Sequence, residues 1–101
     1  MEEIIMKLII HSGEVRSYSM EAISCAKNGN IAEAKELINK ATSELSKAHG
    51  VQTALIQKEA NGEKTEISLL MVHAQYHLMT SMTLKTLAVE IIDIHEELHK
   101  R

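Results

Sequence analysis

The sequence predicts an all-α protein, an antiparallel three-helix bundle with left-handed packing. The 101 residues contain no proline and only four glycines, so few positions interrupt a helix. Two short segments, Asn28-Gly29-Asn30 and Asn61-Gly62, are typical of helix ends, where glycine or asparagine adopts the left-handed conformation. Between these segments apolar residues recur every three or four positions, which is the spacing of one helix face.

Length and composition limit the classes of protein that this chain can form. A chain of 101 residues forms a single domain, residues 1–101, and oligomerisation is a common source of stability at this size. The net charge is −3 and the only aromatic residues are Tyr18 and Tyr76, which argues against nucleic-acid binding through basic patches or stacked bases. The apolar run Leu69–Val72 is too short for membrane insertion, and no export signal is visible. A lone cysteine, Cys25, fits a reducing compartment, so we expect a cytoplasmic protein.

The first two helices are expected at about residues 3–27 and 30–60. Asn30 can cap the free amide of Glu33, and the carboxyl group of Glu33 can reach back, as in a capping box. Gly50 lies inside the second helix at a cost of about 1 kcal/mol relative to alanine, which the periodicity outweighs. The inward stripe of the first helix is Ile5, Leu8, Ser12, Val15, Ala22 and Cys25. The second helix shows the three-four alternation of left-handed bundle packing along Ile31, Ala34, Ile38, Ala41, Leu45, Ala48, Gln52 and Leu55.

The third helix, expected at about residues 65–100, carries two apolar stripes whose centres lie roughly 150° apart at ~100° per residue. A helix of a monomeric three-helix bundle needs only one stripe. The second stripe therefore predicts another partner, most simply the same helix in other subunits. The alternative is a central helix of a larger bundle, but the chain has only three helices. The first stripe comprises Ile67, Leu70, Ala74, His77, Ser81, Leu84, Ala88, Ile91 and Leu98, and the second comprises Leu69, Val72, Tyr76, Met79 and Thr83.

Two histidines of the third helix are candidates for chemistry. His73 lies between the two stripes, which places it at the boundary between the bundle and a neighbouring subunit, and His77 follows one turn later on the same side. An imidazole titrates near pH 6.5, so at neutral pH it can act as a nucleophile, a general base or a metal ligand. On composition alone, a structural or solvated histidine is the simpler interpretation.

Other groupings of reactive side chains give weaker signals. The spacing of His73 and His77 also suggests zinc, but two ligands do not complete a site, and Ala74 stands where a zinc protease has its glutamate. His95 and His99 repeat this spacing near the last turn, where cations suit the helix dipole, so the spacing alone has little specificity. Packing rather than ligation is expected for Met71, Met79, Met82 and Cys25.

The segment from Leu69 to Ser81 carries a more specific signal. Residues 73–80 match seven of the eight positions of the pattern H-A-Q-D-H-L-M-T. This pattern resembles the signature of the lactose/cellobiose family of IIA components, which belong to the bacterial phosphoenolpyruvate-dependent sugar phosphotransferase system. Ile9–Gly13 and Ala48–Thr53 also resemble stretches of this family, so the likeness extends along the chain.

The resemblance implies both an assembly and a reaction. Family members are homotrimers of three-helix subunits, with the third helices around the three-fold axis. The first histidine of the motif, His73 here, accepts a phosphoryl group from the phosphocarrier HPr on its outer ring nitrogen, Nε2. It passes the group to a cysteine of the cognate IIB component, and the membrane IIC component moves and phosphorylates the sugar. The implied sugar is a β-linked disaccharide such as lactose, cellobiose or diacetylchitobiose, and neither nucleic-acid binding nor direct membrane insertion is expected.

Three neighbours of His73 are candidates for supporting roles. Phosphoryl transfer requires an exposed, neutral imidazole in line with the phosphorus and donors for the equatorial oxygens. His77 can donate to these oxygens or orient the ring of His73. Gln75 points away from His73 on its own helix, so it would act only from a neighbouring subunit, and Thr80 is a candidate hydroxyl donor on the His73 side. A purely structural role stays open for each of the three.

Tyr76 departs from the family pattern. The resemblance implies an aspartate at this position, three of which meet at the trimer axis and can share Mg²⁺. A phenol is a poor ligand for Mg²⁺, and without clustered carboxylates the reason for a cation disappears, so we expect no metal and no other cofactor here. Three tyrosine rings also need more room than three carboxylates. We therefore expect Tyr76 to change the packing of the trimer more than the transfer reaction.

Two alternatives to phosphoryl transfer come from other classes of protein. The first is a non-catalytic helical interaction or regulatory module that has kept the same fold. The second is a histidine-lined bundle that binds metal. The two make different predictions, because the module would never carry phosphate on His73 and the metal-binding bundle would contain zinc.

Overall fold

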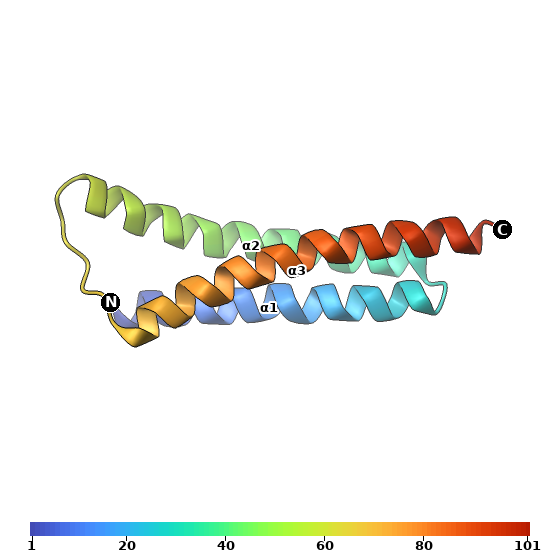
Figure 1. Ribbon diagram of the computed structural model, residues 1–101, viewed down its shortest axis with the longest axis horizontal. Coiled ribbons are helices and arrows are strands. Elements are labelled where there is room, and N and C mark those ends of the chain that lie inside the picture. The colour runs from blue at the N-terminus through green and yellow to red at the C-terminus, as the bar shows by residue number, and fades with distance from the viewer.

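The computed structural model describes residues 1–101 as three long helices and no strand: α1 (Glu2–Lys27), α2 (Ile31–Ala60) and α3 (Leu69–His99) (Figure 1). The helix α2 runs antiparallel to α1, and α3 returns in the direction of α1 (Figure 1). The bundle is elongated, 56 × 20 × 15 Å, with the C-terminus at the end opposite the N-terminus (Figure 1). The predicted all-α class and three-helix bundle are confirmed, and α1 and α2 begin and end within one residue of the expected bounds.

The turn between α1 and α2 lies where the sequence predicted it, but it is held by a different hydrogen bond from the one predicted. Gly29 and Gly62 have φ values of 85° and 90°, the left-handed region that favours glycine, directly after the two helices. The predicted capping box is absent, because the side chain of Asn30 makes no capping hydrogen bond to α2. Asn30 has φ −86° and ψ 67° rather than extended backbone. Its N–H donates to the carbonyl of Cys25 at 2.9 Å, which holds it in the tight turn instead.

The third helix begins at Leu69, four residues later than the predicted start at Thr65. Ser68 is its N-cap, with extended backbone, and the Ser68 hydroxyl accepts a hydrogen bond from the N–H of Met71 at 3.1 Å. A serine in this position satisfies one of the free amides at a helix start, which explains why the helix begins here. Ile67 therefore lies in the loop and is 79% exposed, so it does not belong to the first apolar stripe.

The buried residues of the bundle form two clusters, one toward the α2–α3 loop and one toward the α1–α2 turn. Between them small side chains let α1 and α3 approach, and the Ser81 hydroxyl donates to the carbonyl of Ser12 at 3.0 Å. The clusters comprise Ile5, Leu8, Ala48, Leu55, Met71, Ala74 and Leu78, and Ala22, Ala26, Ala34, Leu37 and Ile92.

The clusters correct several predicted inward positions. Cys25 is half-buried at the edge of the second cluster, because Ala26 takes the fully buried position. Leu70 and Leu98, which the first stripe of α3 included, are exposed. Leu78 and Ile92, which that stripe left out, are buried, so the inward face of α3 is rotated slightly from the predicted one.

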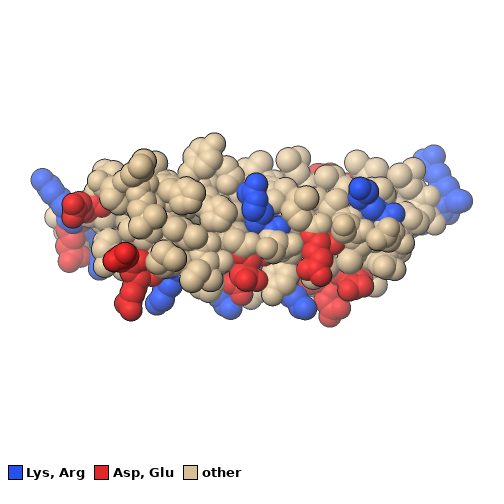
Figure 2. Space-filling view, turned by 90° about the horizontal axis from the view of Figure 1, so that it is seen from below, with Lys and Arg blue, Asp and Glu red and all other residues tan.

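The second apolar stripe of α3 lies on the surface. The exposed fractions of Leu69, Val72, Tyr76 and Met79 are 87%, 52%, 69% and 52%, so neither α1 nor α2 covers them. Figure 2 shows acidic and basic side chains interspersed along one long edge, beside a wide uncharged area. None of the three helices is sufficiently long and apolar to cross a bilayer.

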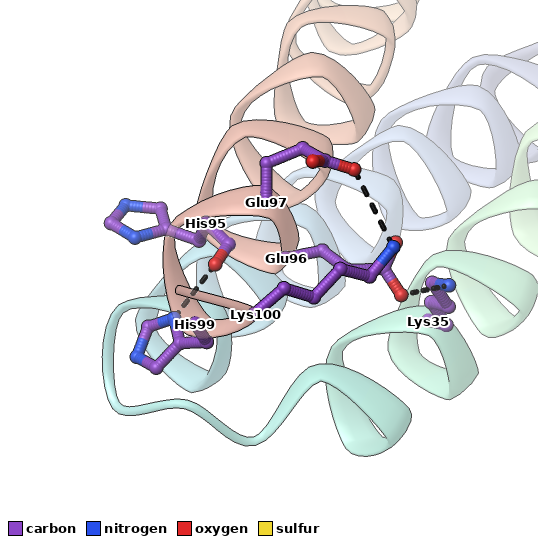
Figure 3. Close-up of polar contacts among 6 residues, drawn as sticks. All are labelled: Lys35, His95, Glu96, Glu97, His99 and Lys100. Carbon is purple, nitrogen blue, oxygen red and sulfur yellow. Dashed lines mark hydrogen bonds and ion pairs between the residues drawn. The ribbon is translucent and has the colours of Figure 1, made fainter.

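Polar contacts hold the far end of α3. The Lys35 ammonium of α2 donates to the Glu96 carboxylate at 2.9 Å, and this hydrogen bond lowers the pKa of Glu96 (Figure 3). The Nδ1 of His99 donates to the carbonyl of His95 at 2.7 Å (Figure 3). This bond satisfies a carbonyl of the last turn, so the second histidine pair serves the helix end.

Candidate functional site

The helix α3 places His73 and His77 one turn apart beside α1. Their rings are stacked, with centroids 6.0 Å apart and planes 8° from parallel. The side chain of His73 is exposed and that of His77 is half-buried. No hydrogen bond engages either ring, so the nitrogens of His73 are accessible to a docking molecule, while His77 supports one face of the ring.

The ring of His77 lies beside the backbone of α1 at Gly13. A Cβ atom on Gly13 would lie 3.8 Å from the Nε2 of His77, which is ordinary van der Waals contact. Burial lowers the pKa of His77 below its ordinary value of 6.5, and the positive charges of Arg16 and His73 lower it further. His77 is therefore neutral at neutral pH and offers one N–H donor and one acceptor nitrogen.

Gln75 and Thr80 are engaged in hydrogen bonds within the subunit. Gln75 faces α2, where its Oε1 accepts a hydrogen bond from the Nε2 of Gln52 at 2.6 Å. The Thr80 hydroxyl donates to the helix carbonyls of Tyr76 and His77 at 3.0 and 3.2 Å. Gln75 therefore lies away from His73, as its position on the helix predicted, and the Thr80 hydroxyl proton already has partners in α3.

The imidazole pair does not form a metal site within one chain. No group of three or more His, Cys, Asp or Glu side chains converges anywhere in the structure. Protein zinc sites use three or four such ligands, so two imidazoles fall short. Tyr76 is exposed on the second stripe and offers a phenol where Mg²⁺ requires carboxylate, carbonyl or water oxygens.

An apolar hollow adjoins His73 on the side of the second stripe. It has a volume of about 690 Å³ and is lined by Leu69, Leu70, Val72, His73 and Tyr76. His73 therefore lies at the edge of the exposed apolar stripe, as its position between the two stripes predicted.

Two residues of α1 complete the surroundings of the pair, and the sequence reasoning missed both. Gly13 lies beside the ring of His77, and Arg16 provides a positive charge one turn later on the same helix. Arg16 is the only arginine within the three helices, and Gly13 lies in the family-like stretch Ile9–Gly13. The three-residue spacing between Gly13 and Arg16 puts both on one helix face, which is the signal that could have found them.

The fold and the site together define a class of protein. The imidazole of His73 lies at the surface, beside the half-buried imidazole of His77, and Arg16 contributes a positive charge nearby. Such an arrangement suits a carrier that receives a group from one protein and gives it to another, because an exposed ring nitrogen is accessible to both.

Comparison with known proteins identifies the carrier. The family described as "PTS system, Lactose/Cellobiose specific IIA subunit" matches residues 3–96. The chain belongs to this family, and it is a sugar-specific IIA component of the phosphotransferase system.

Three known proteins illustrate the similarity. The lichenan-specific phosphotransferase enzyme IIA component of Bacillus subtilis is 56% identical over 98 residues, which cover 97% of this chain and 89% of the relative. The crystal structure of the cellobiose-specific enzyme IIA from Bacillus anthracis matches with a TM-score of 0.96 and 51% identity, over 99% of this chain and 92% of the other. The IIA(Chitobiose) of Escherichia coli, solved in complex with HPr, matches with a TM-score of 0.84 and 46% identity, over 97% and 95%.

Proposed function

We propose that His73 is the phosphoryl acceptor of this IIA component, that HPr is the donor and that a cysteine of the cognate IIB component is the recipient. The observation that carries the proposal is the exposed ring of His73, free of hydrogen bonds and stacked on neutral His77. His73 is the first of the seven residues that match the eight-residue family pattern. The similar IIA(Chitobiose) was solved in complex with HPr, which supports HPr as the donor.

The reaction needs little more than positioning. The lone pair of His73 Nε2 attacks the phosphorus of the phosphorylated donor in line with the leaving atom, so a P–N bond forms as the bond to the donor breaks. In the second step the cysteine thiolate of the IIB component attacks the same phosphorus. A P–S bond then forms, and the electron pair of the broken P–N bond returns to His73.

His77 is the first supporting residue in this proposal. The ring centroids are 6.0 Å apart, so a neutral His77 is near enough to donate its N–H to an oxygen of the phosphoryl group on His73. We assign Gln75 and Thr80 secondary roles. Gln75 would act on a neighbouring subunit after leaving Gln52, and Thr80 would act after turning its hydroxyl from the helix carbonyls.

The working assembly in this proposal is a homotrimer with the α3 helices around the axis. The second stripe is an exposed apolar surface that runs along α3 beside His73. Burial of apolar surface is worth roughly 25 cal/mol per Å², so contacts between copies of this stripe would stabilise a trimer. His73 would then lie in a cleft between two subunits.

The trimer in this proposal contains no metal ion, because Tyr76 lies on the stripe that faces the axis. Native mass spectrometry with and without a chelator tests both parts, and Tyr76→Asp is the comparison variant. We expect the unaltered protein to be trimeric in either condition. Tyr76→Asp is expected to trimerise fully only with Mg²⁺, because its carboxylates repel one another without a cation. A monomer, or loss of the trimer on chelation of the unaltered protein, would contradict the proposal.

We propose that the protein works in the cytoplasm and supplies phosphoryl groups for the uptake of a β-linked disaccharide by the membrane IIC component. Similar proteins are named for lichenan, cellobiose and chitobiose, whose sugars are β-linked, and this supports the substrate class.

Measurement of both transfer steps, from HPr to this protein and from this protein to IIB, provides the test. The protein is incubated with phosphorylated HPr and its intact mass is measured, after which the IIB component is added. We expect one phosphoryl group per chain, lost when IIB is added, and no label on His73→Ala. A folded protein that stays unlabelled while a related IIA component is labelled would instead indicate a non-catalytic interaction module.

A further inference from the structure

Arg16 is an arginine without an acidic partner. It is exposed on α1, and none of the four ion pairs of the structure includes it. The guanidinium group presents five N–H donors in a planar fork that matches carboxylate and phosphate oxygens. An exposed arginine that pairs with no carboxylate is therefore available to bind an anion.

The packing of α1 on α3 places Arg16 near the imidazole pair. The hydrogen bond from Ser81 to the carbonyl of Ser12 fixes how far α1 and α3 are shifted along each other, and a Cβ atom on Gly13 would lie 3.8 Å from the Nε2 of His77. Arg16 follows Gly13 by three residues and so lies on the same face of α1. Its charge acts on His77, where it lowers the pKa of the imidazole.

The direction of the side chain keeps the guanidinium on the side of the imidazole pair. Side chains of a helix lean toward its N-terminus. The helices α1 and α3 run in the same direction (Figure 1), so Arg16 leans back toward His77, whose ring centroid lies 6.0 Å from that of His73. His77 is neutral and contributes a hydrogen bond but no charge, whereas a phosphoryl group on His73 carries about two negative charges near neutral pH.

We propose that Arg16 is a phosphate-binding residue, whose guanidinium donates hydrogen bonds to the phosphoryl oxygens during transfer and in phosphorylated His73. This inference rests on the proposed role of His73 as acceptor. Arg16 of α1 and His77 of α3 then bind the oxygens together, Arg16 as a charged donor and His77 as a neutral one.

A small phosphoryl donor separates direct contact from protein docking. The rate of labelling by phosphoramidate is measured for the unaltered protein and for Arg16→Gln, Arg16→Lys and Lys27→Gln. Lys27→Gln removes another exposed cation of α1 as a matched control. Loss of one hydrogen-bond donor to the charge of a transition state typically costs about 100- to 1,000-fold in rate in a water-excluded site. Arg16 is exposed, so we expect a smaller loss, of at least about tenfold, for Arg16→Gln. Arg16→Lys should retain part of the rate, and Lys27→Gln all of it.

A second measurement distinguishes binding from a structural effect. The ³¹P resonance of phosphorylated His73 is followed against pH, and circular dichroism checks that each variant is folded. Without the guanidinium, the dianionic phosphoryl group is stabilised less, so its titration should move to higher pH in Arg16→Gln. A titration that does not move would overturn the inference.

The controls separate the two proposals. An unlabelled wild-type protein would contradict the role of His73 itself. A labelled wild type with an equally fast Arg16→Gln would overturn only the inference about Arg16. A variant slowed with phosphorylated HPr but not with phosphoramidate would also overturn it, since Arg16 would then serve docking of the donor protein.

Discussion

The rings of His73 and His77 stack with their centroids 6.0 Å apart, yet only His77 is held against α1. The two imidazoles thus have different surroundings. His73 is exposed, whereas burial keeps the pKa of His77 low. This difference is the reason why we propose His73 as the acceptor and His77 as the supporting residue.

Loss of the supporting ring should slow transfer without abolishing it. His77→Ala removes an N–H donor to the phosphoryl oxygens and the surface on which His73 stacks, so we expect phosphorylation by phosphorylated HPr to slow about 10- to 1,000-fold. Rapid-quench labelling measures the rate. His49→Ala, which removes an exposed histidine of α2, is the control and should match the unaltered protein. A His77→Ala variant as fast as the control would exclude a role for His77 in transfer.

The titration of His77 reports directly on its surroundings. We expect NMR titration of its ring protons to give a pKa below 6.5, and Arg16→Gln to raise this pKa because a nearby positive charge is removed. An imidazole with a lowered pKa in the folded state takes up its proton more readily when unfolded, so its contribution to stability is lost as pH falls below about 6.5. An identical pKa in the two proteins would contradict the placement of Arg16.

A polar contact between α1 and α2 should make the stability depend on pH in the acidic range. The Nδ1 of His11 donates to the Glu44 carboxylate at 2.6 Å, and this bond is the main reason why the pKa of Glu44 lies below 4.5. The stabilisation is therefore complete above about pH 5 and is lost as pH falls through the lowered pKa.

Glu44→Gln provides the measurement for this contact. We expect the free energy of unfolding to fall by about 1–2 kcal/mol at pH 7, because a hydrogen bond to a charged group is lost, and by much less at pH 3. Urea unfolding at both pH values measures the difference. Glu36→Gln, an exposed carboxylate of the same helix without a partner, should cost almost nothing. An equal cost at the two pH values would show that the carboxylate charge contributes nothing.

The two helix starts differ in a way that a pair of substitutions can test. Ser68 caps α3 through its hydroxyl, whereas the side chain of Asn30 makes no such bond to α2. Ser68→Ala is expected to cost about 1 kcal/mol of stability, and Asn30→Ala clearly less. Thermal or urea unfolding of the two variants measures both costs. A greater cost for Asn30→Ala would indicate that the side chain of Asn30 does cap α2, as the sequence predicted.

Local sequence signals were sufficient for most of the fold. The spacing of apolar residues and the glycines at 29 and 62 predicted three helices, because helix periodicity and left-handed turns depend on neighbouring residues. The start of α3 was placed too early. Thr65 and Ile67 continue the helical spacing, and only the hydrogen bond between Ser68 and Met71 shows where the helix begins.

The candidate site was predictable along one helix but not across two. The motif of α3 indicated His73 and His77, and the position of His73 between two stripes placed it at an exposed edge. Gly13 and Arg16 were missed because their proximity to His77 depends on how far α1 is shifted along α3, which the sequence does not reveal. The hydrogen bond that commits Gln75 to Gln52 is a tertiary contact of the same kind.

Tandem mass spectrometry of the phosphorylated protein tests the central claim most directly, because it places the phosphoryl group on one of two adjacent histidines. The protein is labelled with phosphorylated HPr and fragmented under conditions that preserve phosphohistidine. The account predicts a phosphoryl group on His73 in both the unaltered protein and His77→Gln. A phosphoryl group on His77, or on neither residue of a folded protein, would contradict it.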